Sequence, residues 1–118
     1  HKLLFTGDAG KTALLQAVDY ADNRQIILSD LNFFHVPHHG SKRNLSSKII
    51  KKMKGITSFV SASKESPKHP AKKVTNALQK HGSTVVVTRG CPICLPYNAP
   101  IRGWGSAQSE QFYESVEE

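Results

Sequence analysis

Residues 3–12 read LLFTGDAGKT, a short apolar run that ends in polar residues and leads into a helical pattern. Two interpretations compete here. The final GKT is how a nucleotide-binding phosphate loop ends, whereas TGD ends a strand with a carboxylate, as a metal site requires. The phosphate-loop motif G-x-x-x-x-G-K-[ST] needs a glycine five residues before Gly10, but Phe5 stands there. Asp8 would also repel a phosphate inside such a loop, so the metal-site interpretation is favoured.

Strand and helix patterns alternate along the first 88 residues. Short apolar or β-branched runs predict strands at 2–6, 33–36, 57–62 and 83–88. Helical spacing of apolar residues predicts one helix over 11–20, one that Asn44 or Ser46 caps and Gly55 ends, and one between Pro70 and Gly82. Residues 26–28 are either a short strand or a buried loop. The alternation predicts the α/β class, a sheet with helices on its faces.

The second part of the chain has a different character. Residues 91–118 are rich in proline and glycine at first and acidic at the end, which predicts an irregular tail after a domain of residues 1–90. The 118 residues, 38% of them hydrophobic, suffice for about one small domain. No apolar run reaches 18 residues and no secretory leader pattern is present, so neither a membrane span nor export is expected. The sequence starts at His1 rather than at a methionine, which suggests a piece of a longer protein.

Charge is distributed unevenly along the chain. The net charge is +7, and four of the nine acidic residues lie within the last nine positions. Between Lys42 and Lys80 there are ten lysines and one arginine but only one acid, Glu65. Such asymmetry indicates either a polyanionic partner, most plausibly nucleic acid, or a solvated face that keeps the protein soluble.

The only cysteines, Cys91 and Cys94, form a C-x-x-C pair. This spacing occurs in zinc knuckles and in redox sites. A structural zinc needs four ligands, and the sequence has no second cysteine pair and no H-x₃₋₅-H. Incidental loop cysteines are therefore the favoured interpretation, and a reducing, cytoplasmic compartment is expected.

The segment FFHVPHHGSKRN, residues 33–44, contains the strongest candidate site. His38 and His39 follow a predicted strand directly, and Asp8 follows another strand in the same way. Sites of open α/β sheets lie at the carboxyl ends of the strands, so these side chains converge if the two strands are neighbours. Imidazole and carboxylate groups are zinc ligands. The alternative is that the histidines are structural.

The order of these motifs resembles a known family. LLFTGDAG, FFHVPHHGS, FVSASKESPKHP and STVVVTRG follow one another as in the C-terminal half of a metallo-β-lactamase-fold domain. The closest likeness is to the domain of ComEC-type competence proteins, which act in DNA uptake. The resemblance covers about residues 2–90 and implies half of an αββα sandwich, a divalent metal, zinc or else manganese, and hydrolase activity.

The resemblance also implies roles for individual residues. Asp8 matches the aspartate that bridges two metals, His39 matches a histidine ligand of the second metal, and His38 matches a neighbour in the catalytic site. His69 matches a histidine near the substrate cleft, although Ser63 replaces a glycine of the family motif and the usual asparagine is not evident.

Two adjacent basic residues, one lysine and one arginine, complete the predicted site. Lys42 and Arg43 follow the histidine pair and are candidates to hold substrate phosphates; an ordinary polar loop is the alternative.

The family supplies most of its metal ligands from an H-x-H-x-D-H motif and one further histidine in its first half, and this sequence has neither. Asp8 and His39 would leave a zinc with two protein ligands, where a catalytic zinc usually has three. We therefore expect this chain to be inactive alone and to need a complementary N-terminal half, a partner chain or a second copy. A non-catalytic nucleic-acid-binding or regulatory half-fold is the alternative function.

Overall fold

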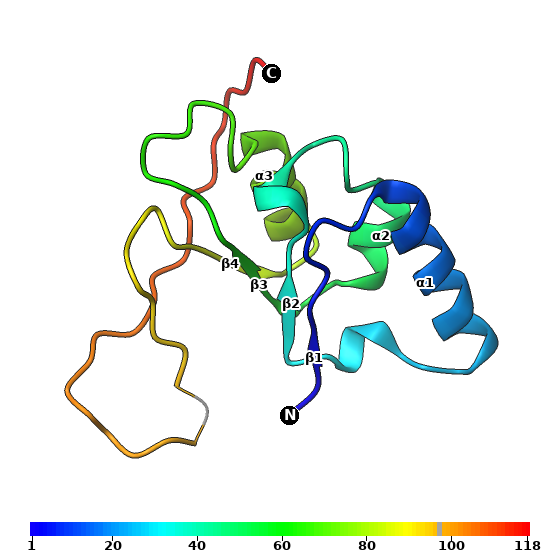
Figure 1. Ribbon diagram of the computed structural model, residues 1–118, viewed down its shortest axis with the longest axis horizontal. Coiled ribbons are helices and arrows are strands. Elements are labelled where there is room, and N and C mark those ends of the chain that lie inside the picture. The colour runs from blue at the N-terminus through cyan, green and yellow to red at the C-terminus, as the bar shows by residue number, and fades with distance from the viewer. Residues whose placement is uncertain (97) are drawn as a thin grey trace.

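The computed structural model describes residues 1–96 and 98–118 and contains one four-stranded parallel sheet (Figure 1). The strands are β1 (Leu3–Leu4), β2 (Phe33–His35), β3 (Thr57–Val60) and β4 (Thr84–Val87), in the spatial order β1-β2-β3-β4. In the register, Leu4 is opposite Phe34, and Ser58 is opposite both Phe34 and Val85. The α/β class expected from the sequence is thus confirmed.

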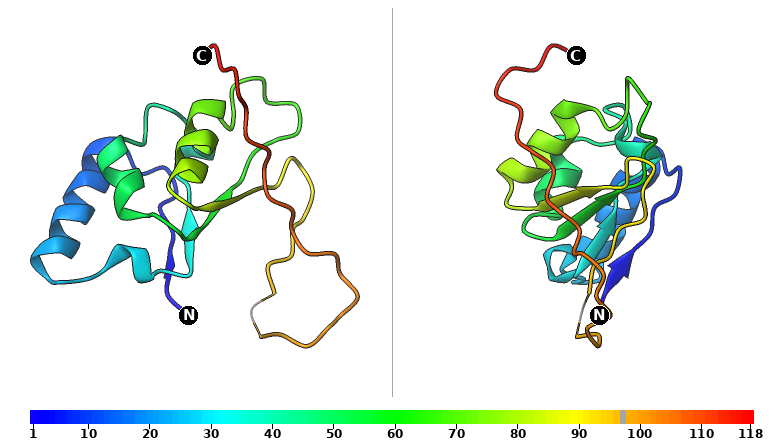
Figure 2. Two further views of the ribbon diagram at one scale, coloured as in Figure 1. Left: turned by 180° about the vertical axis from the view of Figure 1, so that it is seen from behind. Right: turned by 90° about the vertical axis from the view of Figure 1, so that its left-hand side faces the viewer.

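Three α-helices connect successive strands: α1 (Lys11–Asn23), α2 (Ser47–Lys52) and α3 (Lys72–Lys80). Parallel crossovers are almost always right-handed, and here each connection steps to the next strand in the same direction. Such a path places every crossover helix on the same face of the sheet. Figure 2 shows this arrangement, with all three helices on one side; no helix of residues 1–96 and 98–118 covers the opposite face, here called the bare face.

The hydrophobic core fills the space between the sheet and these helices. Alternate strand residues point into it, among them the fully buried Phe34, Val60 and Val85. Leu78 of α3 and Ile49 of α2 meet them from the helix side and are also completely buried. The period of two along the strands and the spacing of three to four along the helices account for this core.

The helix ends differ in how well the sequence predicted them. Ser46 caps α2, because its hydroxyl accepts a hydrogen bond from the Ile49 N–H at 3.5 Å. Helix α3 begins at Lys72, two residues after Pro70. Ala71 keeps an extended conformation because its N–H donates to the Gly40 carbonyl at 3.0 Å, and the helix can start only after it.

Residues 26–28 are neither a strand nor a buried loop. Ile26 and Ile27 are exposed, and a 3₁₀ turn follows at Leu28–Asp30. The Ile26 N–H donates to the Ala21 carbonyl at 2.8 Å, so the segment closes the end of α1 rather than joining the sheet. Three successive apolar residues show no periodicity, so the sequence could not distinguish a strand or a buried loop from this exposed helix end.

The tail contains no helix and no strand among its described residues, 91–96 and 98–118. One isolated bridge pairs Cys94 with Ser106, and both cysteines are free thiols. Its last part, residues 107–118, returns to the domain and runs along β4 and α3 (Figure 1). Across the described residues, no helix has the length and apolar character needed to cross a membrane.

Candidate functional site

Two turns at the carboxyl ends of β1 and β2 form the centre of the candidate site. Gly7, at φ +52°, shapes the turn that presents Asp8. The His38 N–H donates to the Gly7 carbonyl at 3.1 Å, which joins the histidine turn directly to the aspartate turn. The Thr6 hydroxyl adds a bond to the His35 carbonyl at 2.5 Å. The parallel pairing of β1 with β2 therefore brings Asp8 and the histidine pair to one edge of the sheet, as the sequence predicted.

The histidine turn is a single 3₁₀ turn over His38–Gly40. His38 and His39 both have left-handed backbone angles, with φ of 50° and 56°, a conformation that costs non-glycine residues about 1–2 kcal/mol each. Gly40 is buried against Pro70 and Val60, where a Cβ atom would lie 2.8 Å from Pro70 Cβ. The turn is thus held in an unfavourable backbone conformation by the packing beneath it.

His39 is oriented by a contact of its own. Its Nδ1 lies 2.8 Å from the carbonyl oxygen of Ser61, which can only accept, so Nδ1 carries the proton. The other ring nitrogen, Nε2, then has a free lone pair on an exposed side chain. Metal-binding histidines are commonly oriented in this way by a backbone carbonyl.

Two further histidines lie near His39. The His69 ring centroid is 6.5 Å from that of His39, and the His69 Nδ1 is buried and has no hydrogen-bond partner. His35 is half-buried on the bare face of the sheet, and its Nδ1 likewise has no partner. Burial lowers the pKa of His35 below its usual range; the nearby His39 lowers it further, while Asp8 opposes the change. His35 is therefore kept neutral near pH 7.

The predicted substrate-binding residues also come together. Lys42, Arg43 and His69 line one cavity of about 740 Å³, together with His38 and Lys68. Of the histidine turn, His38 lines this cavity, whereas the candidate metal ligands Asp8 and His39 do not. The cavity joins segments that lie about 30 residues apart along the chain.

The two turns supply two side-chain donors for a metal. Asp8 and the free Nε2 of His39 suit zinc or manganese. In the part of the chain that the structure describes, however, no three His, Cys, Asp or Glu side chains gather in a metal-binding arrangement. Two donors are fewer than a catalytic zinc requires, so the residues present do not form a complete metal centre.

Some residues of this site could not be recognised in the sequence. Asn44, a candidate helix cap, instead donates from its side chain to the Ala9 carbonyl at 3.2 Å and ties its loop to the aspartate turn. Glu118 reaches the same cavity from the tail. Contacts between such distant segments leave no local pattern that would reveal them.

Comparison of the chain with models of known families, with curated proteins and with solved structures found no match.

Proposed function

We propose that this chain is the C-terminal part of a metal-dependent hydrolase of the metallo-β-lactamase type, acting on phosphodiesters of nucleic acid. The observation that carries the proposal is the junction of the two turns. The hydrogen bond from His38 to Gly7 joins the histidine turn to the turn that carries Asp8, and the contact of His39 Nδ1 with the Ser61 carbonyl leaves Nε2 without that partner.

A complementary half is part of the proposal because Asp8 and His39 do not complete a centre. It would supply the remaining ligands, as the first half does in the family that the sequence resembles. A metal pair bound in the completed site would supply an activated water and neutralise charge on the phosphoryl group. The residues of this chain would position the substrate, with Lys42 and Arg43 on its phosphates and His38 and His69 beside them.

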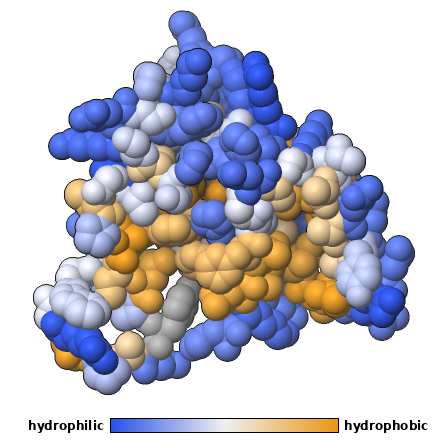
Figure 3. Space-filling model, in the orientation of Figure 1, coloured by the Kyte–Doolittle hydropathy of each residue, from blue (hydrophilic) through white to orange (hydrophobic). Residues whose placement is uncertain are grey.

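The bare face of the sheet supports this need for a partner. Phe5, Phe33, His35 and Phe59 form a row of ring contacts across it, with centroids 5.5–6.2 Å apart. Phe5 remains 69% exposed. Figure 3 shows the apolar area in the middle of this face. An uncovered aromatic row of this kind is typical of an interface, and we assign it to the complementary half.

Reconstitution tests the proposal. The chain alone, incubated with Zn²⁺ or Mn²⁺ and with single-stranded or duplex DNA, should not cleave. Co-expression with a segment that carries H-x-H-x-D-H, encoded in the same or an adjacent reading frame, should produce cleavage that Asp8→Ala abolishes and Cys91→Ser leaves intact. Robust cleavage by the chain alone that is lost in Asp8→Ala would falsify the half-site proposal.

A second candidate function is nucleic-acid binding without catalysis. The basic cavity favours it, because Lys42, Arg43, Lys68 and His69 can contact phosphates whether or not a metal is present. Reconstituted protein that binds DNA tightly but never cleaves it would decide in favour of this function.

A further inference from the structure

The acidic end of the chain folds back onto the basic surface. Residues 107–118, here called the tail strap, run along β4 and α3. Figure 2 shows from behind how this segment passes α3 on its way to the upper end of the domain. Four of the nine acids of the chain lie in this strap, and two of them, Glu110 and Glu118, contact the domain that carries most of the positive charge.

The first part of the strap is anchored by polar contacts of Glu110. The Glu110 side chain, only 8% exposed, accepts from Arg89 at 2.6 Å and from the Tyr113 hydroxyl at 2.7 Å. The Glu110 N–H donates to the Val85 carbonyl at 2.6 Å, on the outer edge of β4. This edge would otherwise be open for pairing, and the strap covers it.

The middle of the strap is fixed to α3 by a reciprocal pair. The Asn76 side chain donates to the Tyr113 carbonyl at 2.7 Å and accepts from the Tyr113 N–H at 2.9 Å. The Lys72 ammonium lies 4.9 Å from the centre of the Tyr113 ring, and Lys80 lies 5.8 Å from that of Phe112. Both lysines belong to the basic segment, so the strap covers part of that segment.

The last residue of the strap reaches the candidate site. The Glu118 carboxylate accepts from the backbone N–H groups of Lys72 and Lys73, at 2.8 Å each, at the first turn of α3. The Lys73 ammonium also donates to the Glu118 carbonyl oxygen at 2.5 Å. Glu118 lines the same cavity as Lys42, Arg43 and His69. A carboxylate therefore lies where the positive end of a helix and a basic cavity would favour an anion.

We propose that the tail strap is an intramolecular competitor, whose Glu118 carboxylate must leave the basic cavity before a phosphate group can bind there. This inference rests on the proposed function in that Lys42, Arg43 and His69 are taken as phosphate-binding residues. The strap contains the chemical features of a competitor: a carboxylate in the cavity and a separate anchor at Glu110 that keeps the segment nearby. Release requires the contacts of Glu118 to break, and the Asn76–Tyr113 pair resists it by holding the adjoining part of the strap on α3. The anchor at Glu110 can stay in place.

Inorganic phosphate is the probe of choice because it tests the cavity without nucleic acid. Amide resonances of Lys72 and Lys73 are followed by NMR during phosphate titrations of the full chain. Glu118→Gln should strengthen phosphate binding at these amides by roughly two- to five-fold, the range expected for a partly screened charge interaction. Glu117→Gln is the matched control, since it removes the same charge from a neighbour that makes none of these contacts, and it should change binding far less.

The Asn76→Ala variant distinguishes two causes of stronger phosphate binding, release of the strap and loss of a negative charge. It removes the reciprocal pair with Tyr113, leaves the net charge unchanged, and places a good helix former in α3. It should strengthen phosphate binding in the same direction as Glu118→Gln. Equal effects of Glu117→Gln and Glu118→Gln, no effect of Asn76→Ala, or absence of phosphate binding in all variants would each overturn the proposal.

Duplex DNA binding by the same variants separates this proposal from the proposed function. If Glu118→Gln and Asn76→Ala strengthen phosphate binding but no variant binds DNA at 50 mM salt, the strap competes with small anions as proposed and the nucleic-acid function is wrong. If DNA binds and the affinities of the variants for DNA rank as their affinities for phosphate do, both the competitor proposal and the nucleic-acid function are supported.

Discussion

His39 shows how one backbone contact determines what a side chain can bind. With Nδ1 held by the Ser61 carbonyl, only Nε2 remains for a ligand, and the neighbouring turn, joined through His38 and Gly7, carries the Asp8 carboxylate. We predict that the chain binds Zn²⁺ weakly, because two donors hold a metal less firmly than three. Titration calorimetry should show this weak binding, and Asp8→Asn and His39→Ala should each reduce it.

The cysteines provide the control for that measurement. Cys91 and Cys94 are free thiols in the tail, and cysteine sulfur is a strong zinc ligand. The Cys91→Ser, Cys94→Ser double variant should bind zinc as the unaltered chain does. Loss of binding in this variant would assign the metal to the tail and remove it from the two turns.

His35 gives a prediction about pH. Its pKa is lowered in the folded state, mainly by burial, so the unfolded chain binds a proton more readily than the folded chain. The stability that neutral His35 contributes should therefore be fully present at pH values above its ordinary pKa of 6.5. The free energy of unfolding should decrease as the pH falls from there to the pKa of the folded state. Urea unfolding between pH 7.5 and 5.5 should show a smaller decrease for His35→Phe, which keeps a ring in the aromatic row. The same decrease in both proteins would contradict this role of His35.

At the scale of elements, helices and strands were predictable where apolar residues recur at one regular spacing, either helical or alternating. Val74 and Leu78 on α3, and the alternation through Phe34 and Val36 at β2, mark the buried sides without ambiguity. The start of α3 could not be foreseen. It depends on the hydrogen bond of Ala71 to Gly40, a contact between segments about 30 residues apart.

Gly40 connects the histidine turn to that start of α3, and its substitution should be costly. A side chain there would face both a φ of +77° and a contact of 2.8 Å with Pro70 Cβ. We expect Gly40→Ala to lower the free energy of unfolding by about 2–5 kcal/mol, the sum of left-handed strain and overpacking. Chemical denaturation measures this directly.

Gly55 is the matched control, because it has the same φ of +77° but nothing within 4 Å of an added Cβ. Gly55→Ala should cost only the backbone term of about 1–2 kcal/mol. If the two variants are equally destabilised, Gly40 is not packed as tightly against Pro70 as the structure indicates.

At the scale of the whole molecule, the alternation of strand and helix patterns predicted an α/β sheet, but these local patterns did not indicate that all helices share one face. That arrangement follows from the strand order, which local patterns do not specify. The position of the tail strap was equally hidden, since its acids and aromatic residues show no periodicity. The sequence placed Asp8, His38 and His39 after strand ends, where the structure has them, but it did not indicate that Glu118 lines the neighbouring cavity.

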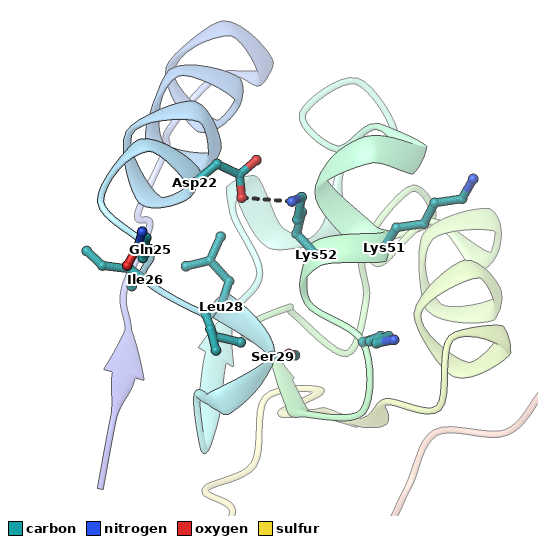
Figure 4. Close-up of a pocket in the computed structure, with 9 residues that line it drawn as sticks. Asp22, Gln25, Ile26, Leu28, Ser29, Lys51 and Lys52 are labelled. Carbon is teal, nitrogen blue, oxygen red and sulfur yellow. Dashed lines mark hydrogen bonds and ion pairs between the residues drawn. The ribbon is translucent and has the colours of Figure 1, made fainter.

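The basic segment from Lys42 to Lys80 is not uniformly free to bind a polyanion. Lys48 is paired with Asp19 at 2.9 Å, and Lys52 with Asp22 at 2.7 Å, so two aspartates of α1 share these charges. Figure 4 shows Lys52 directed at Asp22 while Lys51 points away from it. Exposed pairs of this kind are weak, so the phosphates of a polyanion can compete with the aspartates for these lysines.

We predict that this segment binds duplex DNA electrostatically. If about five of its cations reach phosphates, the log–log dependence of affinity on salt should have a slope of about −4 to −5. Changing Lys51, Lys52 and Lys54 together to Gln should flatten the slope by about two to three units without altering sequence preference. Fluorescence anisotropy at several salt concentrations measures both quantities.

A triple change of Lys2, Lys11 and Arg102 to Gln provides the charge-matched control. It removes three positive charges from outside the segment and should flatten the slope by less than about one unit. Equal slopes in the two triple variants would mean that net charge alone attracts the DNA and that no particular face is used. No binding at 50 mM salt would leave the basic face as a feature of solubility, because dispersed lysines then fail to act together on a polyanion.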